Sequence, residues 1–152
     1  MTTINGLPAH VLLVHGLVVL VPLTAVLLIL CAVWRAARER FIWLVVALAA
    51  ICAVLTPITT EAGDWLEHHI GRTPAIRDHA ELGDTLIYFT IALLIAAVLL
   101  AVVHLRERRD RSLGAPIVVA VAILAIVAGV AATAQVYRIG DSGAHAVWGT
   151  QS

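Results

Sequence analysis

Four blocks of the sequence contain no aspartate, glutamate, lysine or arginine and are almost entirely apolar. They cover residues 9–33, 41–58, 85–103 and 115–137. An α-helix rises about 1.5 Å per residue, so about 20 residues cross a hydrocarbon core about 30 Å thick. Backbone polar groups find no water in lipid, and blocks this continuous lack the alternating pattern of barrel strands. The sequence therefore predicts an all-α membrane protein with four transmembrane helices.

The helices are expected over residues 9–33, 41–59, 74–105 and 115–138, in a single domain that spans residues 1–152. Between the second and third helices, residues 60–70 predict a short outer interfacial helix that continues from the second helix or lies against it. Thr73 followed by Pro74 is typical of a helix start, because Thr caps the first turn and Pro fits its first position. The third helix is therefore expected to begin about two turns before it enters the lipid.

The arginines divide the predicted loops into two sides. The chain has no lysine, and seven of its ten basic residues lie in the short segments 34–40 and 104–114. Short arginine-rich loops stay in the cytoplasm. We therefore expect a multi-pass protein of the cell inner membrane with both termini outside. Only 13% of the residues are charged, and the natural partner of the basic loops is the anionic lipid bilayer, so a nucleic-acid partner has no support.

A short string occurs once in each half of the chain. The first copy is Gly63-Asp64-x-x-x-His68, and the second is Gly140-Asp141-x-x-x-His145. Each half also enters its first helix from the outside with a histidine. The repeat predicts two pseudo-repeated hairpins related by an axis along the membrane normal.

Six of the seven histidines are predicted at or near the outer face. Neutral imidazole is the commonest ligand for transition metals and an axial ligand for haem iron, and bundles build such sites from facing helices. The candidate ligands for a cofactor are His15 and His79, followed by His10, His68 and His145. His15 and His79 are also the leading candidates for a metal.

His10 and His15 point about 140° apart on a helix, so at most one is expected to face a shared site. The sequence does not decide which one does. His69, adjacent to His68, and His104 at the inner face are interpreted as half-wet interfacial residues. Acidic residues on the outer side are candidates to orient the histidines, although acids at helix starts also complement the helix dipole without any function. These candidates are Glu61, Asp64, Asp84 and Asp141.

Several strings together resemble a bacterial four-helix inner-membrane family of unknown function with histidines at its outer face. They are LPAH at 7–10, VHG at 14–16, TEAGDWL at 60–66, HAELGD at 79–84 and GDSGAHAVW at 140–148. The resemblance covers nearly the whole chain. It implies an inner-membrane location and, loosely, a connection to haem or redox chemistry, without an established activity.

The leading hypothesis is a membrane-embedded protein that binds b-type haem or a metal and transfers electrons near the outer face. A non-catalytic accessory subunit of a larger membrane complex is the first alternative, suggested by small residues near Gly129 that suit close helix packing. A copper or zinc site built from the same histidines is the second. Further partners would be a larger membrane redox complex or a second copy of the chain. The sequence has no Gly-x-Ser-x-Gly, His-Glu-x-x-His or phosphate-loop motif, which disfavours a hydrolase or nucleotide enzyme.

Overall fold

Five helices account for nearly all of the chain in a computed structural model, which describes residues 3–4, 7–70, 73–111 and 113–148. The helices are α1 (Ala9–Val33), α2 (Arg35–Ile70), α3 (Pro74–Asp84), α4 (Leu86–Arg108) and α5 (Ala115–Trp148). Before α1, the two-residue strands β1 (Thr3–Ile4) and β2 (Leu7–Pro8) pair antiparallel. Among the described residues, four stretches are long and apolar enough to cross a membrane: Leu12–Val33, Arg35–Trp65, Pro74–Arg108 and Ala115–His145. The prediction of four transmembrane helices is confirmed.

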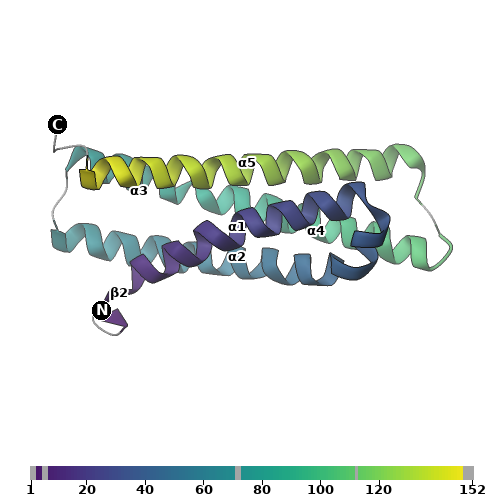
Figure 1. The fold of residues 1–152 in the computed structure, drawn as a ribbon, viewed down its shortest axis with the longest axis horizontal. Coiled ribbons are helices and arrows are strands. Elements are labelled where there is room, and N and C mark those ends of the chain that lie inside the picture. The colour runs from purple at the N-terminus through teal and green to yellow at the C-terminus, as the bar shows by residue number, and fades with distance from the viewer. Residues whose placement is uncertain (1–2, 5–6, 71–72, 112, 149–152) are drawn as a thin grey trace.

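The four long helices form an up-and-down bundle in which α1 and α4 lie diagonally (Figure 1). Each of them packs mainly against α2 and α5, while α3 packs on α5 and touches α2. We call the end that carries His10, His79 and His145 the histidine end, and the opposite end, with Arg35, Arg38 and Arg106, the arginine end. Chain direction fixes this division, because α1 and α3 start at the histidine end and α2 and α5 finish there.

Small side chains line the contacts between the helices. Ala96, Ala97 and Ala132 are fully buried, and a Cβ added at Gly129 of α5 would come within 3.0 Å of the Ile29 side chain on α1. Lipid tails are as apolar as leucine, so membrane helices gain by close van der Waals contact, which small residues permit. The small residues of α5 near Gly129 therefore serve packing within the bundle.

Buried hydroxyl groups are satisfied by their own helices. Thr24, Thr56 and Thr59 each donate to the carbonyl four residues earlier, at 2.7 Å. In lipid an unpaired polar group is costly, and this local bond removes the cost. At the arginine end, Arg38 of α2 pairs with Glu107 of α4 across 3.5 Å, with side chains 7% and 19% exposed. That ion pair ties the two halves of the bundle together.

Helix boundaries differ from the expected ones at three places. Residues 60–70 continue α2 without a break, which was one of the two alternatives, and the short helix at this end of the bundle is α3. The predicted single helix 74–105 is interrupted at Thr85, between α3 and α4. The segment 34–40 is not a loop, since only Trp34 separates α1 from α2. Outside a continuous apolar block, hydropathy no longer marks where a helix stops.

Candidate functional site

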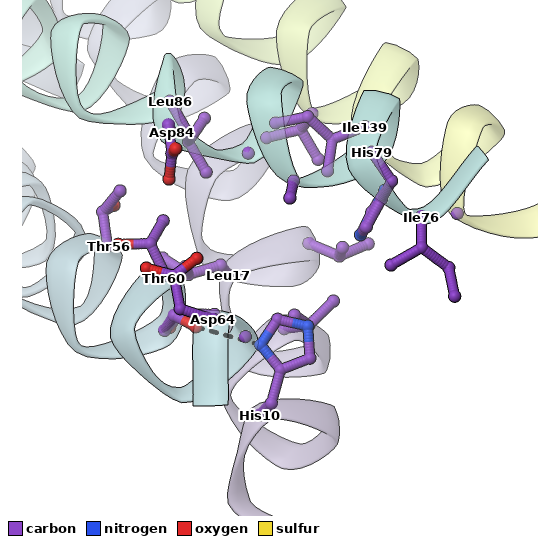
Figure 2. A pocket seen from close by; sticks show the side chains of 18 residues that line it. His10, Leu17, Thr56, Thr60, Asp64, Ile76, His79, Asp84, Leu86 and Ile139 are labelled. Carbon is purple, nitrogen blue, oxygen red and sulfur yellow. Dashed lines mark hydrogen bonds between the residues drawn. The ribbon is translucent and has the colours of Figure 1, made fainter. Parts of the chain in front are cut away.

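A cavity of about 240 Å³ lies at the histidine end between α1, α2, α3 and α5. Its lining is mainly apolar, with Leu17, Val136 and Ile139 among the contributing side chains. The His10 and His79 side chains reach towards this space from α1 and α3 (Figure 2). The structure thus brings together two histidines that lie 69 positions apart in the sequence.

The first histidine, His10, stands in the first turn of α1 and is half-buried. Its Nδ1 lies 2.9 Å from the backbone carbonyl oxygen of Thr59 on α2. A carbonyl can only accept, so Nδ1 carries the hydrogen and donates it. In a neutral imidazole this leaves Nε2 with an exposed lone pair, ready to bind a metal or accept a hydrogen bond.

The second histidine, His79, stands on α3, a helix that begins at the predicted Thr73-Pro74 signal. The Thr73 hydroxyl accepts from the backbone N–H of Ile76 at 3.3 Å, as a capping side chain does. His79 Nδ1 lies 2.9 Å from the hydroxyl of Ser142 on α5, and that hydroxyl donates to the Ile139 carbonyl at 2.8 Å. Because the hydroxyl hydrogen is used, Ser142 accepts from His79 Nδ1–H. His79 therefore presents the lone pair of Nε2, as His10 does.

A glycine lies beneath each ring. A Cβ built on Gly63 of α2 would come within 2.9 Å of His10 Cε1, and one on Gly143 of α5 within 3.0 Å of His79 Cε1. Any side chain there would displace the imidazole. Gly63 follows Thr59 by one helical turn, and Gly143 follows Ile139 by the same step. We call each arrangement, a carbonyl followed one turn later by a glycine, a histidine seat.

The two histidine seats set the register of the internal repeat. The sequence match pairs Gly63 with Gly140, but the residue that receives the second imidazole is Gly143, three positions later. A Cβ at Gly140 would meet nothing within 4 Å. The contacts with the rings therefore align the halves differently from the shared Gly-Asp string.

The remaining histidines lie elsewhere. His15 is exposed on α1 and is not part of the cavity lining. His145 is also exposed, and its Nδ1 donates to the carbonyl of Asp141 at 2.9 Å on its own helix. The side chains of His68 and His69 lie outside the described residues. His104, at the arginine end, is only 3% exposed, so it is a buried residue of the bundle and not an interfacial one.

The four acidic candidates divide into two pairs. Asp64 and Asp84 line the cavity, whereas Glu61 and Asp141 are exposed and stand outside its lining. Within the part of the chain that the structure describes, no three or more His, Cys, Asp or Glu side chains come together in a group that could hold a metal ion. The mainly apolar cavity is thus lined by two imidazoles and by the carboxylates of Asp64 and Asp84.

Sequence reasoning did not single out Thr59, Ile139, Ser142 or Gln135. Gln135 is 4% exposed and bonds to the junction between α3 and α4. A glutamine inside an otherwise apolar block was a usable signal, since polar residues at lipid depth usually have a specific partner. Thr59 and Ile139 act through their backbone carbonyls, which leave no trace in the residue type.

The family described as "Predicted membrane protein (DUF2231)" matches residues 6–151, nearly the whole chain. No curated protein and no solved structure matches the chain.

Proposed function

We propose, from the premise that the chain belongs to the DUF2231 family of predicted membrane proteins, that it binds b-type haem between His10 and His79 and transfers electrons. The observation that carries this proposal is the pair of histidine seats. Two imidazoles from different helices each have Nδ1 engaged, and both side chains line a common cavity.

The donor set suits haem iron. A histidine that ligates a metal usually donates its other ring N–H to a carbonyl, a carboxylate or water, which fixes the tautomer and the ring orientation. His10 meets that pattern directly through the Thr59 carbonyl, and His79 meets it through Ser142. Two histidines are the full axial set of a six-coordinate haem, so the pair needs no third protein ligand.

The shape of the site also suits a flat apolar cofactor. Gly63 and Gly143 give the two imidazoles room to lie against α2 and α5. The cavity walls are mainly aliphatic, so a bound macrocycle would contact apolar side chains. Asp64 and Asp84, which also line the cavity, supply the polar groups at its rim.

The chemistry that haem supplies when bound is one-electron exchange at iron. His10 and His79 would hold the iron through Nε2, the seats would fix the ring orientation, and the aliphatic walls would keep water from the metal. Because His10 and His79 would both hold the iron, the chain would leave little room for a substrate at the metal. Electron transfer therefore fits the geometry better than catalysis at the metal. The arginine-rich opposite end supports the proposal that this end faces the outer side of the inner membrane.

The alternatives account for fewer of the observations. A structural zinc site needs four protein ligands and a catalytic one needs three. The cavity is lined by two histidines and by Asp64 and Asp84, but among the described residues these side chains do not gather closely enough to hold a metal ion. The accessory-subunit hypothesis rested on small residues of α5, and the structure uses Gly129 inside the bundle against Ile29. A larger membrane redox complex or a second copy of the chain remains the proposed electron partner.

The deciding experiment is an absorption spectrum of the detergent-purified protein, oxidised and then reduced with dithionite, from cells supplied with haem. We expect a Soret band and sharp reduced bands of six-coordinate low-spin haem, with one haem per chain by pyridine haemochrome assay. A flat visible spectrum from such cells would refute the proposal. Metal analysis of the same sample separates a haem protein from a copper or zinc protein.

A further inference from the structure

One face of α5 makes successive contacts with α3. Gln135, Ile139, Ser142 and Gly143 lie at helical positions i, i+4, i+7 and i+8, which share a face. Ser142 and Gly143 contact His79, and Ile139 lines the same cavity. Gln135 contacts the far end of α3, beside the cavity residue Val136. This face of α5 therefore meets α3 at both ends.

The contact of Gln135 is with the interruption between α3 and α4. Its Nε2 donates to Thr85 Oγ1 at 2.7 Å and to the Leu82 carbonyl at 3.3 Å. The Thr85 hydroxyl also donates to the Leu82 carbonyl, at 2.7 Å. Arg138 Nη1 lies 3.5 Å from Gln135 Oε1, and because a guanidinium only donates, this contact fixes which side of the amide faces Thr85. A broken helix at membrane depth persists where such side chains satisfy its backbone.

The helix α3 lies at the surface of the bundle, where it packs on α5 and touches α2. None of its eleven residues is buried. Its first turn follows residues 71–72, which are not described, and its ion pair Arg77–Glu81 lies within the helix on the exposed side. The junction at Thr85, where Gln135 is bonded, is therefore a contact that helps to set the direction in which α3 leaves α4.

We propose that Gln135 is a positioning residue for haem ligation: it fixes the junction of α3 and α4 at Thr85, and so places His79 opposite His10. This inference rests on the proposed haem site. It assigns Gln135 no contact with the cofactor. Its action is limited to His79, because the seat of His10 lies on α2 and shares no atom with the junction.

The first test is spectroscopic and compares variants at the junction. Gln135→Leu replaces the amide with an apolar side chain of similar size. We expect haem content to fall about fivefold, in keeping with the loss of a buried hydrogen bond. The haem that remains is expected to be high-spin, held by His10 alone. Thr85→Val should behave in the same way, whereas Thr85→Ser keeps the hydroxyl and should restore low-spin haem.

The matched control is Thr133→Val. Like Gln135→Leu, it removes a polar side-chain group from α5, but this group is a hydroxyl that bonds to the Gly129 carbonyl of its own helix. We expect Thr133→Val to keep wild-type haem content and spin state. Low-spin haem at wild-type content in Gln135→Leu would overturn the inference, and so would equal loss in Thr133→Val.

The second test needs no haem and separates this inference from the proposed function. Spin labels are placed at Asp78 on α3 and Ala120 on α5, both exposed, after the buried Cys31 and Cys52 are replaced by alanine. Ala120 lies roughly 22 Å before Gln135 along the helix axis. Gln135→Leu should broaden or shift the distance distribution, and Thr133→Val should leave it unchanged.

An unchanged distribution in Gln135→Leu would refute the positioning role. If the wild-type protein takes up no haem, the proposed function fails, while a changed distribution would still show that Gln135 fixes α3. If haem binds and only the distribution is unaltered, the failure belongs to Gln135 alone.

Discussion

The two halves of the bundle hold equivalent histidines in different ways. In the first half, His10 belongs to the uninterrupted helix α1 and bonds directly to a backbone carbonyl of α2. In the second half, His79 belongs to a short separate helix and bonds to a side-chain hydroxyl of α5. The same histidine seat is thus built once from main chain and once through side chains. The hydrogen bond of the second seat is therefore the one that a side-chain substitution can remove.

The largest expected effect follows from removing either histidine. His10→Ala and His79→Ala should each reduce haem content to about a tenth or less, since losing even a second-layer partner typically costs 10–100-fold in metal affinity. His15→Ala and His145→Ala are matched controls, because both side chains are exposed and stand outside the cavity lining. Pyridine haemochrome assay of the four purified variants gives the comparison. Loss of haem in His15→Ala, with retention in His10→Ala, would show that His15 is the ligand and His10 is not.

The next effect tests whether the two seats are equivalent. Gly63→Ala and Gly143→Ala each put a methyl within about 3 Å of a ring carbon, and forced overpacking costs about 1–3 kcal/mol. We expect each to lower haem affinity by roughly ten- to a hundredfold, measured by haem titration of the apoprotein.

The control variants for the two glycines are expected to leave haem binding unchanged and to keep or raise the unfolding temperature. Gly16→Ala and Gly140→Ala meet nothing within 4 Å, and alanine in a helix is favoured over glycine by up to about 1 kcal/mol. They should keep haem and unfold at the same or a higher temperature. If only Gly63→Ala loses haem, the seats are not equivalent.

A third prediction concerns the contact that joins the halves at the arginine end. Glu107→Gln leaves the Arg38 guanidinium buried without its countercharge, and its Nε and Nη1 already have no partner among the described residues. Breaking a buried pair on one side costs about 3–5 kcal/mol, and the partial exposure of Glu107 puts this case at about 3 kcal/mol. Thermal unfolding in detergent, followed through the loss of the helical signal, measures this decrease in the free energy of unfolding. A change below about 0.5 kcal/mol would mean that water already screens the pair.

The smallest expected effect concerns the side-chain hydrogen bond of His79, which has a backbone counterpart at His10. Ser142→Ala removes the hydroxyl between His79 and the Ile139 carbonyl, and one net hydrogen bond is worth about 0.5–1.5 kcal/mol. The imidazole loses its partner, so we expect a weaker His79 ligand, with haem content reduced a few-fold at most. Ser142→Thr, which retains the hydroxyl, is the matched control. An effect as large as that of His79→Ala would show that the serine does more than orient the ring.

The fold could be predicted from sequence because hydrophobic length decides it. The four uncharged blocks had no alternative in lipid, and α1 covers the first of them. The ends of α2 and α5 were placed too early, since both helices continue for about ten residues where polar side chains replace apolar ones. In that region the burial signal is absent, and only local capping and propensity remain.

The site could be predicted only as a class of residue. Histidines gathered at one end were visible in the sequence, and His79 was among the two preferred ligands. The choice between His10 and His15 depends on how α1 is rotated against α2, and packing sets that rotation. Thr59 and Ile139 contribute backbone carbonyls, which every residue has. Their role can therefore be recognised only in the three-dimensional structure. Gly143 lies within the string 140–148, but the sequence repeat paired Gly63 with Gly140, three residues earlier.

Helix length bears on which partners could reach the proposed haem site. At 36 and 34 residues, α2 and α5 are about 54 and 51 Å long, well beyond a hydrocarbon core of about 30 Å. Thr59 lies about 36 Å along α2 from its first residue. The histidine seats therefore stand at the level of the lipid headgroups. A water-soluble carrier could dock there and come close to the cofactor without entering the lipid.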